Sequence, residues 1–335
     1  MKSRARAFAA VAIFGLGASP VAAQAPPPII DMHLHALPLS EFGGGMSVCT
    51  NDQEVTFPGA DPSRPMTLDR VMKCASPRPS PTTDEAVMRE SLAMLRRYNV
   101  WAVTAGPLDA VSAWRAAEPD RILPAVSFAG RTPPSPAELR RLHADGRFVV
   151  LAEIGAQYRG RSLDDPSFEP YFALAEELDI PVGVHLGQGP PGAPYLGYST
   201  YRARLTSPFQ LEEVLIRHPR LRLYVMHYGS PLVDEMIALL YSHPQVYVDV
   251  AQNNWGFPRA HFYDELRRLV DAGFGERILF GSDQMVWPET IRLAIETIEA
   301  APFLSQQQKR DIFYGNAARF LRLTPAEVAR HHAGR

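Results

Sequence analysis

The sequence predicts an α/β fold, a (β/α)8 TIM barrel with an elaborated loop after the first strand and a helical extension at the C-terminus. Three observations predict it. The chain has 335 residues, a length that such barrels often reach as a single domain. From residue 82 onward, short apolar runs alternate with helical patterns. The runs are apolar throughout, which is typical of parallel strands that are covered on both faces.

One predicted strand lies near the N-terminus, and the other seven fall within the repeat. The expected strands cover residues 28–33, 100–106, 121–128, 148–155, 181–187, 221–229, 246–252 and 277–283. The helical patterns cover residues 84–98, 108–117, 136–145, 168–179, 209–219, 231–244, 260–273 and 288–300. Eight strand–helix units in one chain favour a closed barrel. An open, doubly wound sheet is the alternative that the same alternation allows.

Two segments do not fit the repeat. Residues 37–81 are rich in Gly, Pro and Ser and are too long for an ordinary connection, so we expect a loop at the face where barrel active sites lie. Residues 302–321 are expected to form a final pair of helices. The predicted barrel domain is residues 29–323, and residues 324–335 are expected to form a C-terminal tail.

The N-terminus has the pattern of a secretory signal peptide. Lys2, Arg4 and Arg6 precede an apolar run that ends in alanine-rich sequence, so residues 1–23 are expected to be removed by cleavage near 23–25. A membrane anchor that stays in place is the alternative. No later stretch is long and apolar enough to cross a bilayer. We therefore expect a secreted or periplasmic protein that has no membrane contact after cleavage.

The charge of the chain argues against a nucleic-acid partner. The formal net charge is −2, and loss of the signal, which carries three basic residues and no acidic one, changes it to −5. No basic block occurs, and aromatic residues do not interleave with Lys or Arg clusters. We expect the partner to be a small-molecule substrate, and we leave open that the chain forms a homo-oligomer.

Both cysteines, Cys49 and Cys74, lie in the segment after the first strand. In an oxidising compartment they are placed to form a disulfide that restrains this long loop. Two free thiols, or a metal site that uses them, are the other interpretations. Their spacing is not the C-x-x-C of a zinc knuckle.

Four histidines lie at the carboxyl ends of predicted strands. His33 and His35 end the first strand in IIDMHLHA (residues 29–36), and alternate residues of a strand point to the same side. His185 ends the fifth strand and His227 ends the sixth. In a parallel barrel these ends meet at one mouth, so we expect the four imidazoles to lie close together.

Two carboxylates are expected at the same mouth. Glu153 stands near the end of the fourth strand, and Asp283 closes the eighth. An unpaired charge after an apolar run is costly to bury, and a divalent cation removes that cost. Carboxylate and neutral imidazole suit zinc, with manganese or iron as other candidates. Each residue alone has an ordinary explanation, such as a core histidine, a helix cap or an arginine pair, but six such groups at the same strand ends indicate a metal centre.

These residues resemble the metal-ligand pattern of the amidohydrolase superfamily. His-x-His on the first strand, one histidine each on the fifth and sixth strands and an aspartate on the eighth are similar to its ligands. The segments IIDMHLHA, LFGSD and YGNAARFLRL most resemble its amidohydrolase-related branch, which includes aminocarboxymuconate-semialdehyde decarboxylase. The resemblance covers residues 29–323 and implies the barrel and a metal-dependent reaction. It does not imply a substrate.

The resemblance implies two alternative ligand sets. The ligands of the single-ion set are His33, His35, His185 and Asp283. In that set His227 orients or deprotonates the attacking water. In the other set Glu153 bridges two ions, because AEIGAQY is similar to members with a bridging glutamate; the first ion is held by His33, His35 and Asp283, and the second by His185 and His227. A Glu153 that only orients a histidine ligand is the remaining interpretation.

The predicted function is that of an exported metal-dependent hydrolase. Water bound to the ion has its pKa lowered toward about 7, so hydroxide is available to attack the carbonyl of a small amide, ester or lactone. Asp283 takes the proton and passes it to the leaving group, and together with His227 it forms the predicted catalytic pair. A metal-dependent non-oxidative decarboxylase of the same branch is the alternative. A non-catalytic binding protein is a third interpretation, which the complete ligand set disfavours.

Polar and aromatic residues that follow the strands are candidate substrate-binding residues. The four that we select are Arg159, Tyr228, Asn253 and Trp287. Arg159 follows the fourth strand and suits a substrate carboxylate. Similar positions are occupied by Gln157, Tyr158, Ser230 and Asn254. Each of these residues is also explained as an ordinary loop residue.

Overall fold

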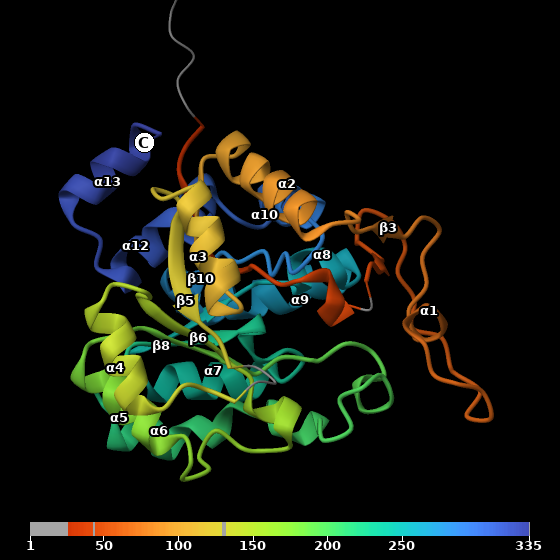
Figure 1. Ribbon diagram of the computed structural model, residues 1–335. Helices are drawn as coiled ribbons and strands as arrows, with labels where there is room; N and C mark the ends of the chain where they lie inside the picture. The colour runs from red at the N-terminus through yellow and green to blue at the C-terminus, as the bar shows by residue number, and fades with distance from the viewer. Residues whose placement is uncertain (1–25, 43, 129–131, 335) are drawn as a thin grey trace, which may run out of the picture.

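The computed structural model describes residues 26–42, 44–128 and 132–334, which contain one sheet of eight parallel strands in chain order (Figure 1). The strands are β1 (Ile29–His35), β4 (Val100–Ala105), β5 (Ile122–Val126), β6 (Val150–Ile154), β7 (Val182–His185), β8 (Leu223–Met226), β9 (Val246–Asp249) and β10 (Ile278–Leu279). The predicted barrel of strand–helix units is confirmed. The signal-peptide prediction concerns residues 1–23, which lie outside the described residues.

Helices cover the outer face of the sheet. They are α2 (Asp84–Arg97), α3 (Leu108–Ala117), α4 (Pro136–Ala144), α5 (Glu169–Glu177), α6 (Glu212–Arg217), α7 (Val233–Ser242), α9 (Arg259–Leu269) and α10 (Glu289–Glu299). Two of them begin at hydroxyl caps: Thr83 accepts a hydrogen bond from Ala86 N before α2, and Ser135 accepts one from Glu138 N before α4. Within the described ranges, no helix combines the length and apolar character needed to cross a membrane.

Hydrogen bonds between the first strand and the last segment of the sheet close the barrel. Met32 N donates to Phe280 O at 2.9 Å, and Asp283 N donates to His33 O at 2.6 Å. Gly281 permits this close approach, since a Cβ there would lie 2.9 Å from the Cβ of His33. The open, doubly wound sheet is therefore not formed.

Apolar side chains fill the barrel and also separate the sheet from its helices. The strand residues of the interior are Ile30, Met32, Val103, Ala105, Ala125, Val150, Ala152, Tyr224, Met226 and Leu279. Leu34 belongs to the outer layer, between sheet and helices. The pairing of β1 with β4 is irregular between Asp31 and Leu34. Such an irregularity changes the direction of side chains. Here two consecutive residues both point inward: Met32 packs in the barrel interior, and His33 lies beside Glu153.

The C-terminal helices close the end of the barrel opposite the mouth. The predicted helix pair is one continuous element, in which a π-helical turn (Asp311–Gly315) joins α11 (Gln306–Arg310) to α12 (Asn316–Leu321). The expected tail contains a further helix, α13 (Pro325–His332), which lies beside α12 (Figure 1). The His331 ring stacks on Trp101 at the start of β4, with 4.1 Å between ring centroids. This part of the chain is thus a packed base rather than a loose tail.

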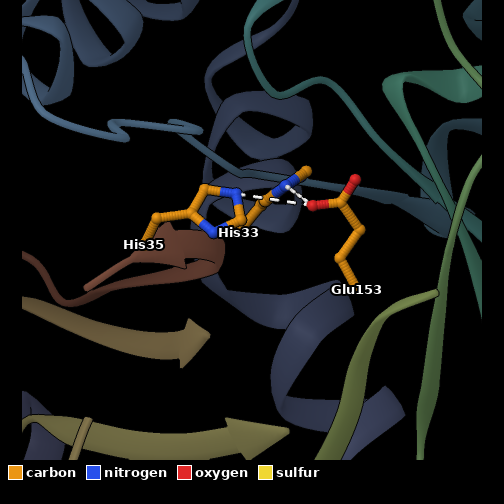
Figure 2. A group of neighbouring side chains, drawn as sticks. All are labelled: His33, His35 and Glu153. Atoms are coloured by element: carbon orange, nitrogen blue, oxygen red, sulfur yellow. Dashed lines mark ion pairs between the residues drawn. The ribbon is translucent and has the colours of Figure 1, made fainter. Parts of the chain in front are cut away.

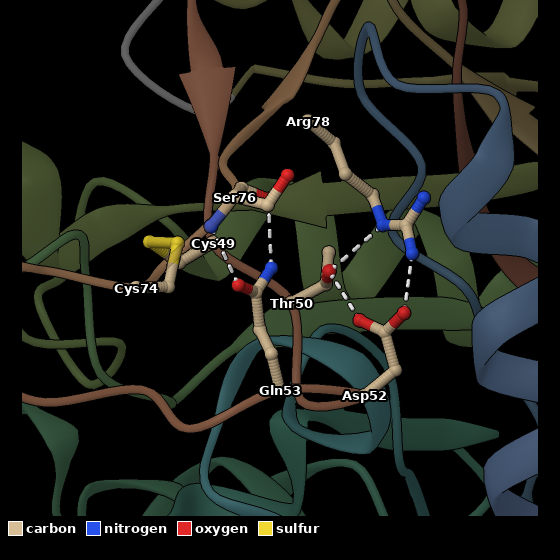
Figure 3. The surroundings of a disulfide bond; sticks show 7 residues. All are labelled: Cys49, Thr50, Asp52, Gln53, Cys74, Ser76 and Arg78. Carbon is tan, nitrogen blue, oxygen red and sulfur yellow. Dashed lines mark hydrogen bonds and ion pairs between the residues drawn. A yellow bond between two sulfur atoms is a disulfide. The ribbon is translucent and has the colours of Figure 1, made fainter.

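The segment of residues 37–81 forms an arm that extends away from the barrel (Figure 1). It contains two short antiparallel strands, β2 (Ser47–Val48) and β3 (Arg78–Pro79), and the single-turn helix α1 (Leu68–Val71). A disulfide joins Cys49 to Cys74 (Figure 3), so the first interpretation of the two cysteines is confirmed.

Hydrogen bonds on both sides of the disulfide fix the arm. The Gln53 amide donates to Ser76 O and accepts from Ser76 N, each at 2.8 Å (Figure 3). Trp287, which follows β10, donates from Nε1 to Met46 O at 2.7 Å. Asn51 N donates to Trp255 O at 2.7 Å. The arm is therefore attached to the segments that follow β9 and β10.

Removal of the disulfide is expected to destabilise the fold. The bond spans 25 positions, and restraint of a loop of this length in the unfolded chain contributes about 3 kcal/mol. Urea unfolding of the Cys49→Ser/Cys74→Ser double variant is expected to give a free energy of unfolding lower by about this amount than that of the oxidised wild type. Wild-type protein kept in reductant serves as the control and is expected to match the double variant. An unchanged transition would contradict this role.

His331 is expected to make stability depend on pH. Burial and the positive charge of Arg330 lower its pKa from the ordinary 6.5 to about 4. Between these values the unfolded chain binds a proton at this position and the folded chain does not, so the free energy of unfolding falls as the pH falls. A change from about pH 7.5 to about pH 5 is expected to cost about 2 kcal/mol through this side chain. Urea unfolding at both pH values measures it, and His331→Gln, which takes up no proton, is expected to lose this part. Equal falls in both proteins would contradict the assignment.

Candidate metal centre

The structure brings all six predicted ligands together at the mouth of the barrel. They come from the carboxyl ends of β1, β6, β7, β8 and β10, and all of their side chains are buried. The residues are His33, His35, Glu153, His185, His227 and Asp283. The fold places them there because parallel strands all end at the same side of a barrel.

His33, His35 and Glu153 face one another (Figure 2). Glu153 Oε2 lies 3.8 Å from His33 Nε2 and 3.6 Å from His35 Nε2. Asp283 Oδ1 lies 3.7 Å from His33 Nε2 and 3.0 Å from His35 Nε2. Tetrahedral zinc with bonds of about 2.1 Å sets its ligand atoms about 3.4 Å apart. Each of these two imidazole nitrogens therefore lies about as far from each carboxylate oxygen as two ligands of one ion do.

A second group of ligands shares Glu153. Its other oxygen, Oε1, lies 3.8 Å from His185 Nε2. The His227 ring is 4.5 Å from the His185 ring and 5.0 Å from the His33 ring, between centroids. Potential ligand atoms of Glu153, His185 and His227 all lie within 4.8 Å of one another. The two oxygens of one carboxylate thus face two neighbouring groups of imidazoles.

Asp249, the last residue of β9, makes hydrogen bonds with two of the histidines. Its Oδ2 lies 3.1 Å from His33 Nδ1, and its Oδ1 accepts from His227 N at 2.8 Å. His227 Nδ1 lies 3.0 Å from Ala251 O. Acceptors at Nδ1 favour the tautomer with the proton there, which leaves the opposite nitrogen of each ring free for a metal.

A left-handed turn directs His227 into the mouth. The φ angles of His227, Tyr228 and Gly229 are 59°, 42° and 65°, a region that residues with a side chain seldom occupy. The Tyr228 hydroxyl donates to Glu265 Oε2 at 2.8 Å and so ties the turn to α9. Gly187, after β7, leaves room for the ring, since a Cβ there would lie 2.4 Å from the His227 Cβ. The position of His227 is therefore set by its neighbours on three segments.

The protonation of the two carboxylates and of His185 favours metal binding. Burial raises the pKa of Glu153, but His33, His185 and His35 outweigh it and lower this pKa to about 2. Burial acts on Asp283 in the same way, and the charge of His33 and the hydrogen bond of His35 hold its pKa well below the usual range. Burial and the charge of His227 lower the pKa of His185 to about 3. At neutral pH the site therefore offers ionised carboxylates and, at His185, a neutral imidazole, the forms that bind metals. Burial lowers the pKa of His33, but the charges of Asp283 and Asp249 outweigh it and raise this pKa well above its usual value, so His33 gives up a proton when it binds a metal.

The residues present fit a divalent cation. Within the described ranges, the buried carboxylates of Glu153, Asp249 and Asp283 are paired with histidines and with no lysine or arginine. His33 Nε2 is buried without a hydrogen-bond partner. A cation at this point would compensate the buried negative charge and give the nitrogen a partner. The mixed nitrogen and oxygen donors suit zinc, manganese or iron.

Comparison with known families identifies the chain. The model of the amidohydrolase family matches residues 30–323. The chain belongs to the amidohydrolase family. The resemblance drawn from the histidine and aspartate motifs is confirmed, and the protein is an enzyme of a metal-dependent superfamily. A search of curated proteins finds no match to this amidohydrolase.

Solved structures share the fold of this amidohydrolase. An uncharacterized TIM-barrel protein from Bordetella bronchiseptica is 20% identical, with a TM-score of 0.55 over 74% of this chain and 83% of its own. 5-Carboxyvanillate decarboxylase from Sphingomonas paucimobilis is 18% identical, with a TM-score of 0.52 over 70% and 82%. A probable 2-pyrone-4,6-dicarboxylic acid hydrolase from Acinetobacter baumannii is 17% identical, with a TM-score of 0.55 over 88% and 99%. Such identities establish a common fold and leave the reaction open.

Two of the predicted substrate-binding residues support His227 instead of facing the mouth. Tyr228 is fully buried, and its hydroxyl is bound to Glu265 on α9. Asn253, at the start of α8 (Asn253–Gly256), donates from Nδ2 to His227 O at 3.2 Å. These positions do not fit the substrate-binding role predicted for Tyr228 and Asn253, because both polar groups are already used inside the protein.

The other two predicted substrate-binding residues, Arg159 and Trp287, have contacts outside the ligand group. Trp287 is buried, binds Met46 O and packs against Phe42, so it holds the arm to the barrel. Arg159 is exposed and borders a surface cavity together with Tyr171 of α5. The substrate-binding role of Arg159 and Trp287 therefore stays a prediction.

Two residues of the site were not among those selected from the sequence. Asp249 has the same signal as Glu153, an acidic residue in an apolar run, and that signal was sufficient to find it. Tyr158 lies in the 3-10 turn η2 (Ala156–Arg159) directly after β6, and its hydroxyl is 3.1 Å from His185 Nε2. Burial and the charge of Glu153 raise the pKa of Tyr158 well above its usual value, so the hydroxyl keeps its proton.

Asp249→Asn is expected to weaken metal binding by about 10- to 100-fold, because an amide holds the His33 ring and the His227 backbone less firmly than a carboxylate does. Competition with a chromophoric chelator measures the metal Kd. Asp234→Asn is the matched control, since Asp234 is an exposed carboxylate on α7 that pairs with Arg268. The control is expected to keep the wild-type Kd. Wild-type affinity in Asp249→Asn would remove the role assigned to it.

Proposed function

We propose that this amidohydrolase is a two-metal hydrolase that acts on the carbonyl of a small amide, ester or lactone. The orientation of Glu153 carries the proposal. Its Oε2 faces His33 and His35, and its Oε1 faces His185. A carboxylate that presents one oxygen to each of two imidazole groups suits a bridge between two ions. Decarboxylating members of the branch are not expected to have such a bridging acid.

The proposed ligand assignment follows from this bridge. Glu153 is shared by the two ions, and zinc is the metal that we propose. The first ion is held by His33, His35 and Asp283, and the second by His185 and His227. When bound, divalent ions supply Lewis acidity, which lowers the pKa of water toward about 7 and polarises a carbonyl oxygen.

Asp283 and His227 carry the catalytic roles that we propose. Asp283 is held ionised at the mouth by the neighbouring imidazoles. It accepts the proton of the attacking water and delivers it to the departing amine or alcohol, which completes hydrolysis without a change in its own final state. His227 is locked by Asp249 and Ala251, so its ring orients the reacting groups from a fixed position.

Export is part of the proposal. The first 23 residues have the basic, apolar and small-residue pattern of a signal peptide. The Cys49–Cys74 disulfide supports the same proposal, because such bonds persist in oxidising compartments. Periplasmic or secreted material is therefore the form in which we expect the enzyme to act.

Glu153→Gln is expected to lower the zinc content from about two equivalents to about one and to reduce kcat by at least about 100-fold. The reason is that an amide does not replace the two anionic oxygens that face the two imidazole groups. Elemental analysis gives the zinc content, and the rate is measured on 4-nitrophenyl acetate, dihydrocoumarin and acetanilide. Glu177→Gln, at an exposed carboxylate paired with Arg140, is the control and is expected to match the wild type.

Two outcomes would contradict the proposal. A single equivalent of zinc in both the wild type and Glu153→Gln would remove the bridge. Release of CO2 from aromatic acids, with no hydrolysis of the ester, lactone or amide, would assign the decarboxylase reaction instead.

A further inference from the structure

We propose that Tyr158 is a further catalytic residue, whose hydroxyl donates a hydrogen bond to the substrate's carbonyl oxygen as negative charge develops there. This inference rests on the proposed hydrolase function. Its starting observation is that the Tyr158 hydroxyl lies 3.1 Å from His185 Nε2. The same nitrogen lies 3.8 Å from Glu153 Oε1, so it is turned toward the centre of the ligand group.

The hydroxyl loses this acceptor when His185 binds a metal. An imidazole nitrogen has one lone pair, and a nitrogen that uses it for a metal accepts no hydrogen bond. A hydroxyl left without an acceptor at a partly buried site is unfavourable. The donor of Tyr158 is then free beside His185, at the edge of the ligand group where the proposed reaction takes place. A substrate carbonyl oxygen is an acceptor that suits it, and it accepts more strongly as it becomes an oxyanion.

The surrounding structure fixes the Tyr158 ring in advance. The ring lies against His185, with 4.9 Å between centroids, and against Tyr198 and Tyr201 at 5.1 and 5.7 Å. Its backbone carbonyl accepts from Thr200 Oγ1 at 2.6 Å. A donor that is held in place before the reaction needs no rearrangement when charge appears, which is the condition for effective transition-state stabilisation.

The proposed step transfers no proton from Tyr158. The water oxygen forms a bond to the carbonyl carbon while the π electrons of the C=O bond move onto the oxygen, which accepts the hydrogen bond. The electrons return as the C=O bond re-forms and the bond to the leaving group breaks. The leaving group takes the proton that Asp283 received from the water, so Tyr158 ends the cycle unchanged.

Tyr158→Phe tests the proposal because it keeps the ring and removes only the donor. With 4-nitrophenyl acetate, kcat is expected to fall by about 100-fold while KM stays within about threefold. A second readout is independent of turnover. Calorimetric binding of 4-nitrophenyl methylphosphonate, a tetrahedral anion, is expected to weaken by about 100-fold in the zinc-loaded variant. Zinc content is expected to equal that of the wild type.

Tyr201→Phe is the matched control. Its ring packs on Tyr158, but its hydroxyl accepts from Gly189 N at 2.9 Å, and we expect kcat and phosphonate affinity within about threefold of the wild type. Wild-type kcat and phosphonate affinity in Tyr158→Phe would overturn the proposal. Loss of a zinc equivalent in that variant would overturn it as well, since Tyr158 would then serve the metal and not the substrate. A wild-type enzyme that hydrolyses no test compound would instead refute the proposed function, and this role with it.

Discussion

Compensation of buried negative charge is the constraint on which the rest of this structure depends. The parallel barrel gathers the carboxyl ends of its strands, and at that point the chain buries Glu153, Asp249 and Asp283 among histidines. Imidazoles alone offset such charge incompletely, since a neutral ring carries none. The irregular pairing of β1 and the left-handed turn at His227 both bring ring nitrogens toward these carboxylates. Local departures from regular structure are thus concentrated where the charge is.

The sequence predicts the barrel and the ligand group because both depend on simple patterns. Apolar runs identify the strands, and polar residues at their carboxyl ends must share one mouth, whatever the details of the loops. His33, His185 and Asp283 follow from that rule directly. Asp249 follows from it too, because it interrupts the run VYVDVAQ as Glu153 interrupts LAEIG. Its role is to orient the His33 ligand, and a pattern of ligand positions does not distinguish such a residue from an ordinary buried acid.

The direction of a side chain just after a strand is harder to predict, because it depends on the turn. Tyr228 follows His227 immediately, yet its backbone is left-handed and its hydroxyl donates to Glu265 on α9. Asn253 is turned back to the His227 carbonyl by the start of α8. Such turns depend on tertiary contacts and on backbone conformations that most residues seldom adopt. A periodic pattern of apolar residues therefore does not predict them. The helix α13 has a local signal that was overlooked, the capping box of Thr324 and Glu327, whereas its anchor, the stack of His331 on Trp101, joins distant parts of the chain and has no such signal.

The metal ligands and the connections around the mouth are held in place by different contacts. Ligands stand on strand ends, whose positions the closed sheet determines, whereas the connections around the mouth differ in length and are held by contacts of their own. The arm meets the connection after β7, since a Cβ at Gly192 would lie 3.6 Å from Met66 Cγ. That same connection carries Tyr198, which packs on Tyr158. The arm is held by its disulfide and by hydrogen bonds to the segments that follow β9 and β10, and not by pairing with the eight-stranded sheet. The metal ligands and the arm therefore depend on different segments of the chain for their positions.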